Sequence, residues 1–257
     1  VYKVSRKGIQ NGFQVNTHAI GDRTNREVLD QYEKVFLEYN DLSFDHRWRI
    51  EHAQHVDPID IPRFGQLGVI ASIQGIHMSS DRPWAIDRLG GKRITEGAYA
   101  WRDLINTGAV LVNGSDVPVE PINPIACFYA SVSRKTLSGS PNNGYEPRQK
   151  MTRMEALKSY TINAAYGAFE EDIKGTVEIG KYADFTVFSQ NIMTVPESEI
   201  LKTKVTHTTA VDQSQRQLPY NIRQTRPTQK EKIIIKKIFL LIINYLINLK
   251  KLLHQLI

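Results

Sequence analysis

Cysteine is almost missing from this 257-residue sequence, and no apolar run is long enough to span a membrane. The single Cys127 excludes an intramolecular disulfide and any zinc site built from cysteines. This composition fits a reducing compartment, and we expect a cytoplasmic location. The uncharged apolar run in the tail, from Ile238 to Leu249, has 12 residues, whereas a spanning helix needs about 20.

No glycine-rich phosphate-binding loop follows any predicted strand, which argues against a nucleotide-binding sheet. The net charge of +6 does not indicate a nucleic-acid surface either. Residues 201–257 hold 11 Lys and Arg against 2 Asp and Glu, while residues 1–200 hold 22 against 25. The body is mildly acidic, so we expect no nucleic-acid partner. The sequence starts at Val1 without an initiator methionine or a signal-peptide pattern, so we expect a fragment.

Strand and helix patterns alternate four times between residues 12 and 169. The predicted strands are residues 12–18, 47–52, 68–74 and 109–112. The predicted helices are residues 23–39, a short helix from Asp57-Pro58, and residues 95–107, 123–135 and 152–169. The apolar residues of 23–39 fall on one face at helical spacing, Asn123-Pro124 is a predicted helix start, and Thr152-Arg-Met-Glu155 is a predicted capping box. This alternation predicts a parallel sheet, either open and doubly wound or half of an eight-stranded barrel. Residues 75–92 contain Pro83 and Gly90-Gly91, so we predict a long loop there.

The composition changes after about residue 172, and we expect the main domain to end there. Residues 174–180 and 183–188 alternate like two β-strands, so residues 173–212 are predicted to form a small β-element. Residues 213–257 are predicted to be a polar linker followed by a low-complexity basic, apolar tail. Its apolar residues recur every seven positions. This spacing is typical of two structures, an amphipathic helix on a membrane surface and a short coiled coil, and the sequence does not decide between them. We expect this tail to be unrelated to the chemistry.

Two histidines and one aspartate follow the ends of three predicted strands. They are His18, His52 and Asp116. The carboxyl ends of parallel strands meet at one edge of a sheet, so these side chains can converge. Two neutral imidazoles and a carboxylate suit a zinc-like divalent ion that keeps an open position for water. Each residue alone also has an ordinary interpretation, as a hydrogen-bonded core histidine or an aspartate that caps a turn.

Four motifs occur in an order and spacing that match a known family. They are Val15-Asn-Thr-His-Ala-Ile-Gly-Asp22, Arg49-Ile-Glu-His-Ala-Gln54, Gly114-Ser-Asp-Val-Pro118 and Lys174-Gly-Thr-Val-Glu-Ile-Gly-Lys-Tyr-Ala-Asp184. This set resembles the amidohydrolase superfamily, and in particular the amidohydrolase-3 type that includes N-substituted formamide deformylases. The stretch with His77, Asp81 and Trp84 and the segment from Tyr160 to Ala165 are similar to that type as well. The resemblance covers about residues 12–190.

The resemblance implies an α/β fold, a (β/α)8 TIM barrel of a metal-dependent hydrolase with a small β-sandwich, of which this chain holds strands 5–8. It implies His18, His52 and Asp116 as ligands of a divalent metal, for which zinc is the best candidate. Asp116 would also accept the proton of the nucleophilic water and pass it to the leaving nitrogen. His77 and Asp81 would contact the substrate, or would brace their loop as a hydrogen-bonded pair. The implied reaction is hydrolysis of a non-peptide carbon–nitrogen bond in a small-molecule amide or formamide.

Two parts of the family pattern are missing from the sequence. The family takes two further histidines from a His-X-His after strand 1 and a bridging carboxylate from near strand 4, and none of the seven histidines here forms a His-X-His. We therefore expect the C-terminal half of a barrel, with a site that this chain does not complete. Three hypotheses remain: a piece of a working hydrolase, an inactive half-barrel that binds partners through its basic apolar tail, and a half-barrel that closes its ring as a homo-oligomer.

Overall fold

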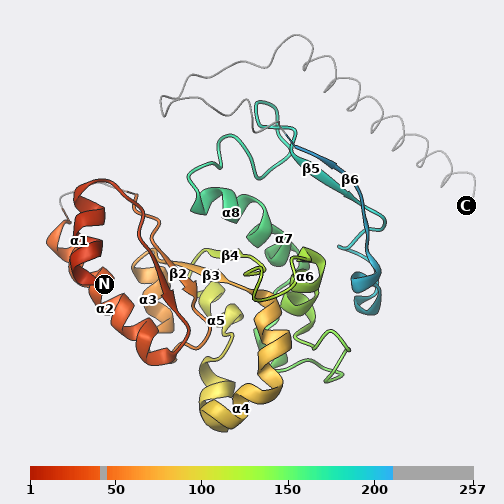
Figure 1. Cartoon of the computed structure of the whole chain (residues 1–257), viewed down its shortest axis with the longest axis horizontal. Helices are drawn as coiled ribbons and strands as arrows, with labels where there is room; N and C mark the ends of the chain where they lie inside the picture. Colours follow the sequence, from red (N-terminus) through yellow and green to blue (C-terminus); the bar gives the residue numbers. More distant parts are fainter. Residues whose placement is uncertain (41–44, 211–257) are drawn as a thin grey trace, which may run out of the picture. The chain divides into compact units, whose positions relative to one another are not determined.

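A four-stranded parallel sheet forms the centre of the computed structural model, which describes residues 1–40 and 45–210 (Figure 1). Its strands are β1 (Asn16–Ala19), β2 (Arg49–His52), β3 (Ile70–Ile73) and β4 (Leu111–Asn113). They lie in the sheet in chain order, and each neighbouring pair is parallel. A doubly wound sheet reverses its strand order at a switch point. The observed order is therefore that of a barrel segment, the second of the two predicted architectures.

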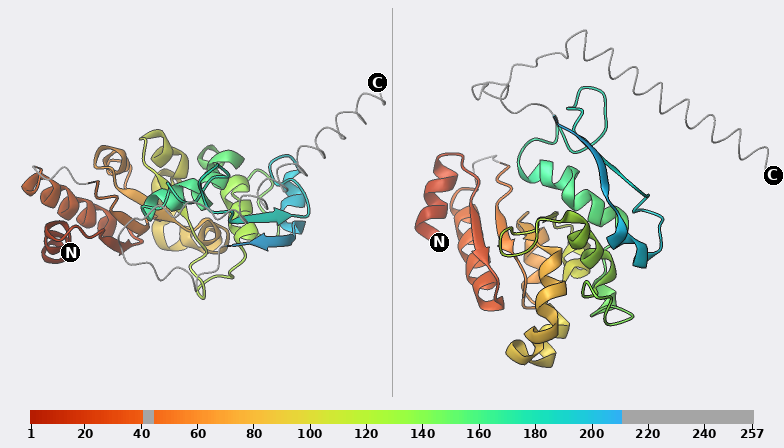
Figure 2. Two further views of the ribbon diagram at one scale, coloured as in Figure 1. Left: turned by 90° about the horizontal axis from the view of Figure 1, so that it is seen from above. Right: turned by 45° about the vertical axis from the view of Figure 1, so that its right-hand side comes forward.

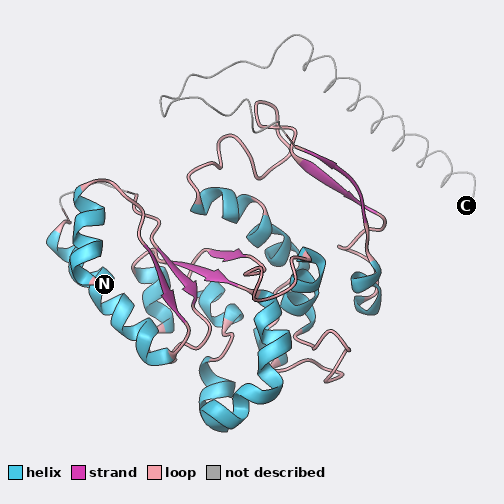
Figure 3. Ribbon diagram, in the orientation of Figure 1, coloured by secondary structure: helices cyan, strands magenta, loops and turns pink. Residues whose placement is uncertain are grey.

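Helices follow each of these strands (Figure 3). The described helices are α1 (Tyr2–Gln10), α2 (Asp22–Glu38), α3 (Ile61–Gln66), α4 (Gly75–Gly97), α5 (Trp101–Asn106), α6 (Pro124–Ser133), α7 (Arg153–Tyr160) and α8 (Ile162–Gly167), with short 3-10 helices η1 (Pro147–Gln149) and η2 (Glu197–Lys202). Helices α1 and α2 lie side by side, and α2 also packs against β1 (Figure 2). Among the described residues, no helix has both the length and the apolar composition needed to cross a membrane.

The two faces of the sheet differ in character, because successive side chains of a strand point to opposite faces. One face is apolar and buried in the core, with Ala19, Ile50, Ala71, Ile73 and Leu111. The register aligns a different set on the other face: Asn16 with Arg49 and Ile70, and His18 with Glu51, Ser72 and Val112. On this second face Asn16 and His18 are exposed, and Arg49, Glu51 and Ser72 are partly exposed.

Helix α2 covers the apolar face through the apolar stripe that its sequence predicts. Val28, Leu29, Tyr32 and Val35 are fully buried on this stripe. The Tyr32 hydroxyl lies 2.7 Å from the Thr17 hydroxyl, and its ring meets the ring of Trp48 edge to face. A buried phenol needs such a partner, because an unpaired polar group in the core is costly.

The predicted loop at residues 75–92 is wrong, because this segment forms most of helix α4. Pro83 lies inside the helix, and Gly90, with φ of +76°, marks a kink between two helical parts. Burial of Ile76, Met78 and Ala85 stabilises the helix although Pro83 and Gly90 disfavour it. Tertiary packing thus outweighs the local helix-breaking signals.

Three further helix predictions differ from the structure, and the helix predicted for residues 152–169 is divided at Thr161 into α7 and α8. Helix α3 begins at Ile61 and not near Asp57, whose carboxylate instead accepts a hydrogen bond from the backbone N–H of Ile59. The helix predicted for residues 95–107 is interrupted between Gly97 and Trp101. At Gly97 an added Cβ would lie 2.0 Å from the carbonyl oxygen of Val56, so the chain needs glycine there.

The described residues divide into two compact units, one with residues 1–40, 45–176 and 188–206 and the other with residues 177–187 and 207–210. The strand predicted at residues 183–188 is present as β5 (Phe185–Phe188), which pairs with β6 (Val205–Thr209). The strand predicted at residues 174–180 is wrong. Gly175 and Gly180 both have φ of +98°, which interrupts an extended strand. The amphipathic helix or coiled coil predicted for the tail lies outside the described residues.

Helices α6 and α7 begin with the predicted caps. The side chain of Asn123, the residue before α6, accepts a hydrogen bond from the backbone N–H of Ile125, the second residue of that helix. At α7, Thr152 and Glu155 form a capping box in which each side chain accepts from the other's backbone N–H. Hydrogen bonds from Arg102, one of them 2.7 Å long, hold the pKa of Glu155 at about 2, below its usual 4.5.

Substitution Glu155→Gln should lower the free energy of unfolding by about 1 kcal/mol at neutral pH, because glutamine keeps the capping box but loses the charged hydrogen bonds with Arg102. Because the pKa of Glu155 is lower in the folded chain than in the unfolded chain, its contribution is present above about pH 4.5 and is lost as the pH falls toward 2. The variant should therefore lose less stability than the wild type between neutral and acidic pH. Urea unfolding at several pH values measures this, with the exposed Glu27→Gln as control; parallel curves for wild type and Glu155→Gln would contradict the prediction.

Candidate metal centre

Three potential metal-binding side chains come together after the carboxyl ends of the strands. They are His52, His77 and Asp116, and one donor atom of each lies within 4.8 Å of the others. His52 is the last residue of β2, His77 lies in the first turn of α4 directly after β3, and Asp116 follows β4. Because β2, β3 and β4 are parallel neighbours, their ends meet at one edge of the sheet. We call these three residues the donor cluster.

His18 lies beside the donor cluster. Its ring centroid is 4.5 Å from that of His52, with the rings edge to face, while the rings of His52 and His77 are 5.6 Å apart. The structure thus places two of the predicted ligands, His52 and Asp116, in the donor cluster, and the third, His18, next to His52 but outside that cluster. It adds His77, which sequence reasoning had assigned to a loop that contacts the substrate.

Two members of the donor cluster have an unusual backbone conformation. The φ angles of His52 and Asp116 are +76° and +58°, in the left-handed region that favours glycine. Such a conformation costs about 1–3 kcal/mol and persists only where the surrounding structure enforces it. At Asp116 the enforcing bonds are visible, since its carbonyl accepts hydrogen bonds from the N–H groups of Val119 and Glu120.

The environment of His52 keeps its imidazole in the form that binds metals. Burial of the ring, and next the neighbouring His18, lower the pKa of His52 below its ordinary value. The neutral imidazole is therefore favoured, and this is the ligand form. Its Nδ1 is buried without a hydrogen-bond partner among the residues that the structure describes. Buried polar atoms rarely stay unpaired, so a metal ligand role fits this nitrogen.

His77 lies between two carboxylates. Its Nε2 is 3.2 Å from Oδ2 of Asp116, and its Nδ1 is 3.6 Å from Oε1 of Glu120. The hydroxyl of Ser80 donates a hydrogen bond to the same Glu120 oxygen. Glu120 had no signal in the sequence, because only the turn after Asp116 brings it back toward α4.

Asp81 lies on α4, one turn beyond His77, so the predicted loop position of both residues is wrong. Its Oδ2 accepts a hydrogen bond from the amide of Gln54, 3.3 Å away, and that amide also donates to the hydroxyl of Tyr99. His77 and Asp81 thus bond to different partners. Gln54 thus connects the segment directly after β2 to α4.

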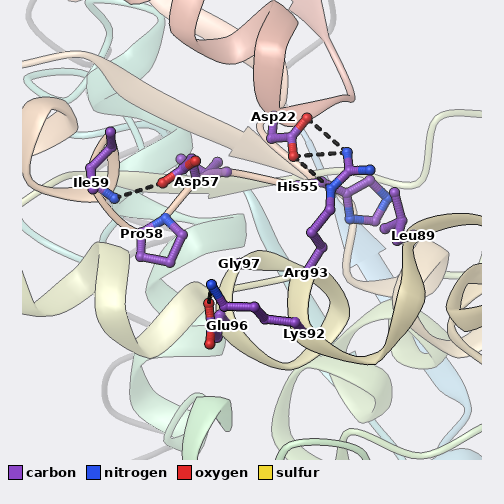
Figure 4. Close-up of a pocket in the computed structure, with 11 residues that line it drawn as sticks. Asp22, His55, Asp57, Pro58, Ile59, Leu89, Lys92, Arg93, Glu96 and Gly97 are labelled. Atoms are coloured by element: carbon purple, nitrogen blue, oxygen red, sulfur yellow. Dashed lines mark hydrogen bonds and ion pairs between the residues drawn. The ribbon is translucent and has the colours of Figure 1, made fainter.

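A separate cavity of about 250 Å³ opens beside the kinked half of α4 (Figure 4). His55, Asp57 and Arg93 are among its lining residues, which do not include the donor cluster. Both guanidinium contacts of Arg93 go to Asp22, at 2.8 Å, as the dashed lines show. Burial lowers the pKa of His55 to about 4, so this imidazole is neutral at physiological pH. Among the described residues, only the donor cluster brings three such donor atoms within reach of one ion, so it is the stronger candidate for a metal centre.

Comparison with known proteins identifies related sequences and folds. The model of the amidohydrolase family, Amidohydro_3, matches residues 2–213. Protein LONG AFTER FAR-RED 3 of Arabidopsis thaliana is 38% identical over 182 residues, which cover 71% of this chain and 30% of that protein. N-substituted formamide deformylase of Arthrobacter pascens is 25% identical over 209 residues, which cover 81% of this chain and 37% of that enzyme.

A solved structure, an uncharacterized metal-dependent hydrolase from Pyrococcus horikoshii, superposes with a TM-score of 0.64 and 28% sequence identity. The match covers 76% of this chain and 38% of that structure, which confirms the predicted α/β fold as part of a metal-dependent hydrolase. The chain spans about a third of the length of the curated relatives that it matches. Since the family model matches most of its residues, the chain belongs to the amidohydrolase family.

Proposed function

We propose that the whole protein hydrolyses a non-peptide carbon–nitrogen bond of an amide or formamide, and that this chain supplies part of its metal site. The observation that carries the proposal is the donor cluster at the carboxyl edge of a parallel sheet, where barrel enzymes hold their catalytic residues. Family membership supports a metal-dependent hydrolase. The likeness to a formamide deformylase supports the type of bond.

His52 and Asp116 would hold the metal, with His18 next to them as the third predicted ligand. Imidazole and carboxylate donors without cysteine suit zinc. When bound, zinc would lower the pKa of a water molecule and polarise the scissile carbonyl. The sequence holds no His-X-His, so these residues are only part of the ligand set known for the family.

Asp116 would transfer a proton during hydrolysis, as a general base and then as a general acid. Its carboxylate is partly exposed, so a water molecule can reach it while one oxygen faces His77. It would accept a proton from the attacking water and pass that proton to the leaving nitrogen. Asp81, held by Gln54 on α4, stays a proposed substrate contact, and His77 is a candidate both for the substrate and for the metal.

Zinc binding by the 257-residue chain tests the metal site. The wild type should bind zinc, and His52→Ala should weaken binding at least tenfold, because it removes a buried nitrogen that has no hydrogen-bond partner in the described part of the chain. Metal analysis of the purified proteins and competition with a coloured chelator measure this. His207→Ala is the control, since His207 is an exposed residue of β6. Equal, negligible zinc in the wild type and in His52→Ala would contradict the proposal.

Hydrolysis by the whole protein tests the proposed role of Asp116. Asp116→Asn should lower kcat for an N-substituted formamide by about 10²- to 10⁴-fold, the usual contribution of a general acid–base group. Release of formate and of the amine is measured in parallel. The matched control is Asp87→Asn, an exposed carboxylate on α4. Unchanged kcat in Asp116→Asn would rule out the assigned role.

A further inference from the structure

Gln54 lies between the end of β2 and helix α4, two residues after His52. Its side-chain amide donates to Oδ2 of Asp81 at 3.3 Å and to the hydroxyl of Tyr99 at 3.0 Å. We propose that Gln54 is a positioning residue, which fixes the Asp81 carboxylate beside the donor cluster for contact with the substrate. The inference rests on the proposed function for the role of Asp81 as a substrate contact.

The position of Asp81 follows from the periodicity of α4. Asp81 comes four residues after His77, so both side chains lie on the same side of the helix, one turn apart. Because His77 belongs to the donor cluster, Asp81 lies one helical turn farther from the edge of the sheet. Its side chain is partly exposed. A substrate held at the donor cluster therefore comes within reach of this carboxylate.

The carboxylate of Asp81 keeps acceptor positions for a substrate. Among the described residues, its hydrogen-bond partners are the amide of Gln54 and the hydroxyl of the neighbouring Ser80. Two carboxylate oxygens have about four acceptor positions, and an ionised carboxylate has no hydrogen to donate. The substrate group that Asp81 contacts is therefore a hydrogen-bond donor, such as an N–H or an O–H.

Gln54 is itself held by buried neighbours. Gln54 is only 8% exposed, and Tyr99 only 1%. The backbone carbonyl of Gln54 accepts a hydrogen bond of 2.7 Å from the N–H of Tyr99, so backbone and side chain both join these two residues. The carbonyl of Tyr99 accepts a hydrogen bond of 2.7 Å from the fully buried Arg134. Gln54 thus connects Asp81 to a buried network that does not move with the surface.

The chemistry of the amide fixes the orientation of the Gln54 side chain. Because a carboxylate only accepts hydrogen bonds, the amide nitrogen and not the amide oxygen faces Asp81. The second hydrogen of the same nitrogen goes to the hydroxyl of Tyr99. Rotation of the amide would break both bonds and bring two oxygens together. One oxygen of Asp81 is therefore held in place, while the other oxygen stays near Ser80.

The turn directly after β2 connects Gln54 to the candidate ligand His52. His52 and Ala53 have φ angles of +76° and +43°, two consecutive residues in the left-handed region. Such a turn persists only where its surroundings enforce it, and the two bonds between Gln54 and Tyr99 do so on one side. The same turn therefore directs His52 to the donor cluster and Gln54 to Asp81.

A double-mutant cycle in the whole protein tests the positioning role. Gln54→Met keeps the length and apolar packing of the side chain but removes both amide hydrogens. It should raise KM for N-butylformamide about fivefold, the effect of one lost hydrogen bond, and leave kcat nearly unchanged. Asp81→Ala should raise KM about tenfold or more, because it removes the charged acceptor itself. Gln66→Met is the matched control, an exposed glutamine of α3.

The combination of the two substitutions separates positioning from a general loss of structure. In the Asp81→Ala background, Gln54→Met should have no further effect on KM, because the residue that Gln54 positions is gone. Zinc affinity should stay at the wild-type value in Gln54→Met, because the backbone bond to Tyr99 remains. Additive effects on KM, or a wild-type KM in either single variant, would overturn the proposal.

Nitrogen NMR of the side-chain amides in the 257-residue chain separates this proposal from the proposed function. The Gln54 signals, identified by their loss in Gln54→Met, should shift in Asp81→Ala and in Tyr99→Phe but not in the exposed control Asp87→Ala. Gln54 signals that are identical in the wild type and in Asp81→Ala would refute the positioning role. A whole protein that hydrolyses no amide or formamide would refute the proposed function alone, and the amide signals would then decide the role of Gln54.

Discussion

The hydrogen bonds between four parallel strands determine where every donor of the candidate site lies. Because β1 to β4 pair in chain order, their carboxyl ends form one edge, although His18 and Asp116 are nearly a hundred residues apart. Each strand has only three or four residues, so a small shift in register would carry a donor away from its partners. The left-handed conformations of His52 and Asp116 then set the direction of these two residues at the end of their strands.

A buried ionic network holds α4, the helix that carries His77. Arg134 at the end of α6 is fully buried and donates to the carbonyls of Tyr99 and Tyr145. Its charge is compensated by Glu146, which also binds Arg82 of α4 at 2.7 Å. Burial lowers the pKa of Arg134 to about 10, so the guanidinium stays charged at neutral pH. Removing one partner would leave a buried charge unpaired, so the network connects α4 firmly to α6.

The sequence predicted the parts of the molecule that depend on local patterns. Four strands, the apolar stripe of α2 and the caps at Asn123 and Thr152 follow from residue spacing and side-chain chemistry. Helix α4 was missed, because Pro83 and the glycine pair favour a loop while its stabilising contacts come from residues distant in the sequence. Glu120 was missed for the same reason: a turn and the packing of α4, rather than any motif, bring it to His77.

The face of the sheet that carries Asn16, His18, Arg49 and Glu51 has a consequence for the surface that the four strands present to water. The interior of most protein folds is apolar, and half of such a fold would aggregate when separated from the rest. This face is mixed: Arg49 and Glu51 form an ion pair on it, whereas Ile70 and Val112 on the same face are buried. The apolar part of the face is therefore covered, and its exposed part is polar or charged. Contact with water costs this face less than it would cost an apolar one.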